Sequence, residues 1–151
     1  MLRERVITAL VLVAIVLGTL TADSPFPFVV FCAVLMAAGS WEWARLNGVS
    51  QVVALVCGLV FAGFAAAAAA TDWLARDWSL ALVGTGVLWL VVGSLLLRAG
   101  VPGWGKVPRP LRLMGGAAAL WMAWVAVSQA RMVSVNFLLS VLTLVWAADI
   151  A

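Results

Sequence analysis

The residue of this sequence whose type and position most clearly suggest chemistry is Asp149. It lies in the final stretch LVWAADIA, which is otherwise uncharged and almost entirely hydrophobic. A charged side chain within a bilayer is energetically costly, so an ionisable residue in an apolar membrane segment is a candidate functional group. Taken alone, Asp149 is either a metal-binding carboxylate or a polar residue at the interfacial end of a helix.

The residue types that are missing limit the chemistry open to this chain. It contains no histidine, which is the commonest general base and a frequent metal ligand. Cys32 and Cys57 lie in apolar runs without the spacing of a metal site, so we expect them to pack as small hydrophobic residues. The stretch GWGK lacks the spacing of a phosphate-binding loop. Any chemistry must rest on carboxylates, lysines, arginines or an added ion.

A second group of candidates lies between two apolar stretches, in RAGVPGWGKVPRPLRL. This segment holds four cations, Arg98, Lys106, Arg109 and Arg112, together with three prolines and three glycines. Its composition favours an irregular connection. The cations can set the membrane topology, and they can also contact anionic lipid headgroups, where each contributes about 1 kcal/mol near the surface. Both roles are compatible.

Membrane helices must position these residues. Hydrophobic residues make up 66% of the 151 residues and charged residues only 10%, which leaves too little polar surface for a soluble domain. A crossing helix needs roughly 20 residues. The apolar stretches lack the alternation of barrel strands. We therefore predict an all-α, polytopic membrane helix bundle of about six transmembrane helices in a single domain, with spans at residues 6–22, 26–43, 52–70, 80–97, 113–130 and 133–151.

Two of these spans have special features. The first could be a signal peptide, because Arg3 and Arg5 precede its apolar core, but GTLTADSPF is a poor cleavage site and we keep the segment as a helix. The third combines Gly58 and Gly63 with an alanine run. Small residues of this kind predict close helix packing.

The distribution of cations predicts the orientation of the bundle. Lysine and arginine collect in cytoplasmic loops, and an even number of crossings with a cytoplasmic N-terminus leaves only Arg76 and Arg131 outside. The seven inner cations are Arg3, Arg5, Arg45, Arg98, Lys106, Arg109 and Arg112. The last span then brings Asp149 to the cytoplasmic face, where a soluble ligand can reach it.

Three stretches of the sequence resemble, in order, the amino-terminal part of one family. They are LRERVITALVLVAIVL near the start, WEWARL after the second span, and the terminal WAADIA. Together they are similar to phosphatidate cytidylyltransferases, also called CDP-diacylglycerol synthases. The resemblance covers the helix layout from Leu2 to Ala151, with a looser match in the loop-rich middle.

This resemblance implies a multi-pass enzyme of a bacterial-type inner membrane, usually a homodimer. Such an enzyme transfers the cytidylyl group of CTP to phosphatidic acid with the help of a divalent metal such as Mg²⁺. The family signature reads Asp-x-x-Ala-Tyr-x-x-Gly, followed by a Ser-Pro-Lys-Lys-Thr-x-Glu-Gly stretch, and here the match ends at Asp149, Ile150 and Ala151. The resemblance therefore implies a chain truncated before its C-terminal catalytic region. Asp149 would be a catalytic residue and one metal ligand of a partial site, and the fragment itself would be inactive.

Helix count alone also permits a transporter-like bundle or a structural membrane subunit. The first five predicted spans contain no firmly intramembrane ionisable residue, which transporters usually need. Membrane lipids are expected partners in every case. The net charge of +3 is explained by topology, so we expect no nucleic-acid partner.

Overall fold

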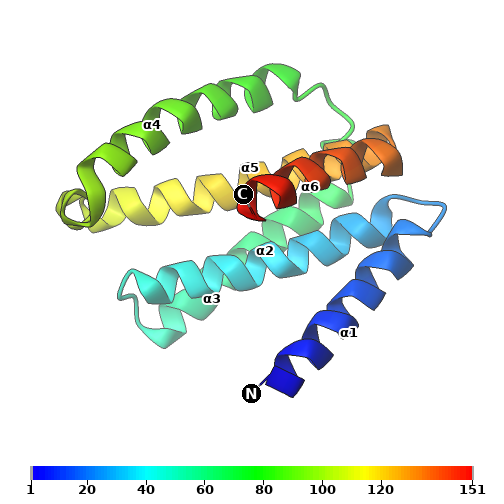
Figure 1. Cartoon of the computed structure of the whole chain (residues 1–151), viewed down its shortest axis with the longest axis horizontal. Helices are drawn as coiled ribbons and strands as arrows, with labels where there is room; N and C mark the ends of the chain where they lie inside the picture. Colours follow the sequence, from blue (N-terminus) through cyan, green and yellow to red (C-terminus); the bar gives the residue numbers. More distant parts are fainter. Residues whose placement is uncertain (1, 151) are drawn as a thin grey trace.

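The chain folds into six helices in a computed structural model that describes residues 2–150 (Figure 1). The helices are α1 (Leu2–Leu20), α2 (Phe26–Leu46), α3 (Gln51–Ala69), α4 (Ser79–Lys106), α5 (Arg109–Val133) and α6 (Val135–Ile150). The side chains that lie outside the described part are those of Leu2, Arg3, Arg5, Thr8, Ala9, Asp149 and Ile150. Residues 2–150 contain no strand, and the all-α prediction is confirmed.

Four of these helices are long and apolar enough to cross a membrane, namely α2, α3, α4 and α5. Within the described residues, α1 and α6 contribute shorter apolar stretches, Leu10–Leu20 and Val135–Ala148. The chain is therefore a helical membrane protein. That the first and last helices also cross stays a prediction.

Local sequence signals explain where several helices begin. α2 starts after Pro25 and carries Pro27 in its first turn, where proline removes no helical hydrogen bond. The Ser50 side chain caps α3 by accepting a hydrogen bond from the Val53 N–H at 3.4 Å. Before α4, the Asp77 carboxylate accepts a hydrogen bond from the Ser79 N–H at 2.9 Å. Hydrogen bonds from Ser79 lower the pKa of Asp77.

The prediction of an irregular loop between residues 98 and 113 is wrong. α4 continues to Lys106 and α5 begins at Arg109, so the segment is largely helical. A bend at Gly100, with φ 62° and ψ −170°, divides α4 into two helical parts, and glycine adopts this conformation without strain. Pro102 falls in the first turn after the bend and Pro110 in the first turn of α5, where prolines are compatible with a helix.

The core of the bundle lies where α2 packs against α3 and α5. Its largest fully buried side chain is Trp124 of α5, whose indole N–H donates a hydrogen bond to the Val29 carbonyl of α2 at 3.1 Å. On α3, a Cβ added at Gly58 would lie 2.9 Å from the Ala37 carbonyl oxygen. Close packing of the third span is thus confirmed at Gly58, whereas a Cβ added at Gly63 would meet nothing within 4 Å.

Side chains of α5 bind the loops at both ends of the bundle. Near its start, Arg109 donates a hydrogen bond to the Gly48 carbonyl in the α2–α3 loop. Near its end, Gln129 donates to the Leu74 carbonyl in the α3–α4 connection. Arg131 donates to the carbonyls of Leu20 and Ala22, where α1 ends. The loops predicted to face the cytoplasm therefore share one end, and those predicted to face outward share the other (Figure 1).

Candidate functional site

Asp149, the first candidate, lies in the last turn of α6. Its side chain is outside the part of the chain that the structure describes. The helix itself packs against α5 and contributes Leu138, which has no exposed surface, to the core. The backbone of Asp149 is thus held at the end of a helix anchored to the centre of the bundle.

The four predicted headgroup-binding cations all lie around the turn between α4 and α5. Arg98 precedes the bend in α4 and Lys106 ends that helix, while Arg109 and Arg112 occupy the first turn of α5. Arg98, Lys106 and Arg109 are exposed, and Arg112 is half-buried. The sequence segment is as cationic as predicted, but helices carry the charges instead of a loop.

An aromatic and cationic cluster ties this turn to α2. We call it the hairpin-end cluster and define it by Trp43, Trp104, Arg109 and Arg112. The Trp43 and Trp104 rings meet edge to face with centroids 6.1 Å apart, and the Trp43 indole N–H donates to the Arg112 carbonyl at 3.1 Å. The Arg112 guanidinium carbon lies 6.0 Å from the Trp104 ring centroid, within cation–π distance. Local sequence spacing does not reveal this role of Trp43, because its partners are remote along the chain.

Arg109 and Arg112 differ in how much of their donor capacity remains free. One guanidinium N–H of Arg109 donates a hydrogen bond to the Gly48 carbonyl. The Arg112 Nε is buried and has no hydrogen-bond partner within the described chain. The guanidinium of Arg112 is thus held in place by Trp104 while retaining an unused donor.

Glu42 and Arg45 lie three residues apart near the end of α2, a spacing that favours an ion pair. Instead, the Arg45 guanidinium carbon lies 5.1 Å from the Trp41 ring centroid. Glu42 is exposed and lines a pocket of about 340 Å³ together with Trp43 and Gly116. Among the described residues, Glu42 has no ion-pair partner.

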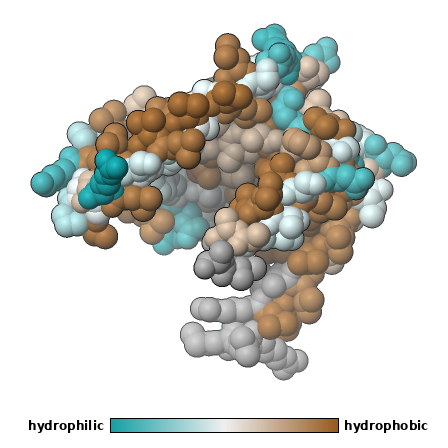
Figure 2. Space-filling model, turned by 45° about the horizontal axis from the view of Figure 1, so that its top comes forward, coloured by the Kyte–Doolittle hydropathy of each residue, from teal (hydrophilic) through white to brown (hydrophobic). Residues whose placement is uncertain are grey.

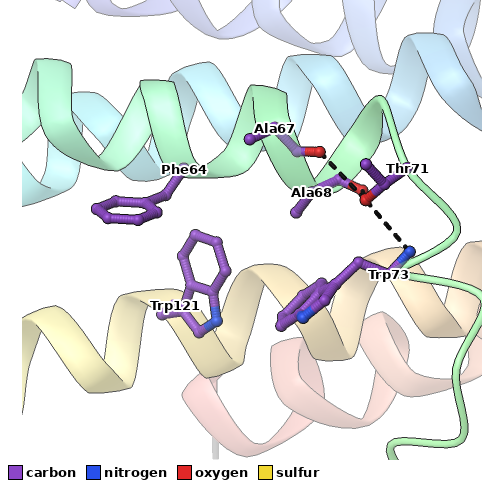
Figure 3. Close-up of a pocket in the computed structure, with 6 residues that line it drawn as sticks. All are labelled: Phe64, Ala67, Ala68, Thr71, Trp73 and Trp121. Carbon is purple, nitrogen blue, oxygen red and sulfur yellow. Dashed lines mark hydrogen bonds between the residues drawn. The ribbon is translucent and has the colours of Figure 1, made fainter.

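A different pocket lies at the opposite end of α3 and has a cavity volume of about 370 Å³ (Figure 3). Phe64, Trp73 and Trp121 form its aromatic walls, and Thr71 supplies its only side-chain hydroxyl. The Thr71 hydroxyl already donates to helix carbonyls and accepts from the Trp73 N–H at 3.4 Å. None of the described residues that line this pocket is ionisable, so these residues offer no group for acid–base or metal chemistry.

A metal site is not complete within the described residues. They contain no group of three histidine, cysteine, aspartate or glutamate residues that could hold an ion. Mg²⁺ takes oxygen ligands and often only one or two carboxylates. Asp149 could supply one of these carboxylates.

The comparison with known proteins decides the family. Residues 3–151 match the profile of the Cytidylyltransferase family. The chain belongs to this family. It is also 31% identical, over 156 aligned residues, to a protein of Pseudomonas aeruginosa named phosphatidate cytidylyltransferase. The alignment covers 99% of this chain and 55% of that relative, so the chain spans about half the length of the curated relative it matches. No solved structure matches the chain.

Family membership confirms the resemblance seen in the sequence. The match extends through the helical hairpin of α4 and α5 as well as the terminal segment with Asp149. These are the regions in which the sequence placed its candidate residues.

Proposed function

We propose that the protein containing this chain is a phosphatidate cytidylyltransferase. It would convert CTP and phosphatidic acid to CDP-diacylglycerol and pyrophosphate. The observation that carries the proposal is the family match over residues 3–151, together with the similarity to a relative of that name. The helical membrane bundle supports it, because a lipid phosphate and a soluble nucleotide meet at a membrane surface.

The reaction itself explains why carboxylates and cations are needed. An oxygen of the phosphatidate phosphate attacks the α-phosphorus of CTP, and the bond to the β-phosphate oxygen breaks as pyrophosphate leaves. Both reactants are polyanions, so catalysis depends on positioning and on neutralising charge. Asp149 is proposed as one ligand of a Mg²⁺ ion, with the remaining ligands supplied by a segment outside this chain.

The cations around the α4–α5 turn are proposed to contact the phosphate of the lipid substrate. Arg98 and Lys106 are exposed and free to reach a headgroup, whereas Arg109 and Arg112 are partly engaged in protein contacts. The proposed location is the inner membrane of a bacterial-type cell, with this turn facing the cytoplasm. A homodimer is proposed as the assembled form, on the resemblance to the family.

The direct test is an activity assay of a protein that contains this chain and is as long as the Pseudomonas aeruginosa relative. Reconstituted with phosphatidic acid, Mg²⁺ and CTP labelled in the cytidine, it should transfer the label to lipid. The isolated chain of residues 1–151 should form no product above background, because Asp149 alone is proposed to be too little to hold the metal that neutralises the two polyanions. Failure of the full-length protein to label lipid would contradict the proposed function. Robust product from residues 1–151 alone would contradict a site completed by other segments.

A further inference from the structure

α4 differs from the other long helices because none of its residues is buried. It is nevertheless apolar enough to cross a membrane along most of its length. Figure 2 shows hydrophobic residues along the side where α4 lies, with hydrophilic residues gathered toward the ends of the molecule. An apolar helix this weakly covered by protein leaves much of its surface to lipid.

One row of residues on α4, which we call the α4 stripe, is half-buried, but none of its side chains is fully buried. Between residues 79 and 98, the half-buried residues recur at helical spacing, at Leu82, Thr85, Gly93 and Leu96. A pocket of about 270 Å³ between α4 and α5 is lined by Thr85 and Trp89 of α4 and by Gly115, Ala118 and Ala119 of α5. Trp89 lines this pocket and two neighbouring ones. The stripe therefore borders a row of apolar hollows.

The stripe continues to the bend of α4, where another hollow has a cavity volume of about 480 Å³. Gly93, Leu96 and Gly100 line it on one side, and Trp104 lines it beyond the bend. Trp104 also carries the Arg112 guanidinium on its ring face. Apolar lining and positive charge therefore meet at a single side chain.

The charge at this end of the hollow is uncompensated in the sequence. Between Asp77 and Asp149 the chain contains no acidic residue, whereas Arg98, Lys106, Arg109 and Arg112 fall in this interval. Glu42 of α2 lines a different pocket, with Trp43 and Gly116. A ligand that fits both features needs an apolar chain joined to a negative group.

We propose that the hollow at the α4 bend binds an anionic phospholipid. One acyl chain lies along the α4 stripe from Gly100 toward Trp89. The phosphate lies among the cationic side chains of Arg98, Lys106 and Arg112, the last of which is held beside Trp104. Recognition is by the phosphate charge and the chain, so a phosphodiester lipid that is not a substrate of cytidylyl transfer binds as well. The proposed function assigns the phosphate of the lipid substrate to the same cations, so this inference rests on that assignment and adds the hollow that receives the acyl chain. Binding of phosphatidylglycerol, which is not a substrate of cytidylyl transfer, tests the hollow separately from the reaction.

The acyl-chain half of the proposal is tested by filling the hollow. A Cβ at Gly93 meets nothing within 4 Å, so Gly93→Leu places a side chain in the hollow without a clash at its base. Gly84→Leu is the matched control, because that glycine lies on the same helix, is equally open and lines none of these hollows. Both changes replace a helical glycine and should favour the helix.

Each variant is purified in neutral detergent, titrated with phosphatidylglycerol, and examined by native mass spectrometry for bound lipid. Gly93→Leu should bind at least about tenfold more weakly than the unaltered chain, equivalent to losing the burial of about two methylene groups. Gly84→Leu should bind as the unaltered chain does. Equal affinities of the two leucine variants, whether both high or both low, would overturn the proposal.

The headgroup half is tested by comparing phosphatidylglycerol with zwitterionic phosphatidylcholine. The double variant Arg98→Gln, Lys106→Gln should lose about tenfold in affinity for phosphatidylglycerol and keep its affinity for phosphatidylcholine. Arg76→Gln, an exposed cation in the α3–α4 connection, should change neither affinity. Unaltered preference for phosphatidylglycerol in the double variant would overturn the headgroup assignment. Displacement of the lipid by an equal concentration of inorganic phosphate would show a free-phosphate site instead.

Discussion

Arg131 is a buried cation whose side chain binds backbone carbonyls that are distant in the sequence. Its side chain is 8% exposed, and its guanidinium donates to the Ala22 carbonyl at 2.9 Å and to the Leu20 carbonyl at 3.4 Å. Carbonyls at a helix C-terminus lack intrahelical partners and carry partial negative charge. Arg131 therefore provides hydrogen-bond donors for carbonyls at the end of α1 and attaches the α1–α2 turn to α5.

Replacing Arg131 by methionine should destabilise the bundle by at least about 2 kcal/mol, because a single hydrogen bond to a charged group contributes about 1.5–3 kcal/mol and Arg131 makes two. Thermal unfolding in detergent measures the change. Arg76→Met is the control, since that side chain is exposed, and it should alter stability by less than about 0.5 kcal/mol. Equal melting temperatures for the two variants would mean that the Arg131 hydrogen bonds contribute little.

At this scale the sequence predicted residue types better than residue partners. Asp149 and the four cations between the fourth and fifth spans were recognisable because charge is rare in so apolar a chain. Arg131 was counted only as an outer cation, because its carbonyl acceptors lie more than 100 positions away, as the sequence separations of 109 and 111 show. Local spacing carries no signal of such a contact.

The packing of α2 on α5 depends on one glycine of a consecutive pair. A Cβ added at Gly116 would lie 2.0 Å from the Trp43 Nε1, whereas one added at Gly115 would meet nothing within 4 Å. The Trp43 indole fills the space beside Gly116 and donates its hydrogen bond to the Arg112 carbonyl. The two glycines therefore have different roles despite being neighbours.

Gly116→Ala should destabilise the protein by about 1–3 kcal/mol, the usual cost of forcing extra volume into a packed contact. The change should also alter tryptophan fluorescence, because the indole of Trp43 must move. Gly115→Ala should be neutral or stabilising by up to about 1 kcal/mol, since alanine favours a helix over glycine. Thermal unfolding of the pair checks the prediction, and a reversed order of stability would show that the α2–α5 contact is misplaced.

The helices themselves were largely predictable, because long apolar runs bounded by charges and prolines leave few alternatives in a membrane. The segment after Arg98 was not. Its prolines were read as helix breakers, but they fall where a helix begins, and Gly100 concentrates the change of direction in one residue. Proline content alone does not distinguish a loop from a segment in which two helices begin, because prolines are common in both.

The arrangement of loops at two ends of the molecule predicts its orientation across the membrane. Arg109 joins the α2–α3 loop to the start of α5, whereas Gln129 and Arg131 bind the turns at the other end. With the cationic end in the cytoplasm, a reporter fused after Gly103 should be cytoplasmic and one fused after Asp72 should lie on the opposite side. Enzyme reporters that are active on only one side measure this. The reverse pattern would remove the cytosolic approach to Asp149.

The central claim for the whole molecule is that Asp149 serves cytidylyl transfer in the full-length protein. Asp149→Asn keeps the volume and removes the negative charge, so membrane levels should be unchanged or slightly higher. An amide oxygen is a weaker Mg²⁺ ligand than a carboxylate. We therefore expect transfer to fall by at least roughly a hundredfold, about 2.7 kcal/mol of transition-state stabilisation.

The decisive measurement is the rate of CDP-diacylglycerol formation by the Asp149→Asn protein at limiting Mg²⁺, relative to the unaltered protein at equal membrane levels. Glu42→Gln is the control, because Glu42 is exposed and has no ion-pair partner among the described residues, and its rate should change little. The predicted result is a large loss for Asp149→Asn alone, partly restored by excess Mg²⁺. A near-normal rate for an Asp149→Asn protein that accumulates normally would contradict the claim and leave Asp149 as a residue of the helix end only.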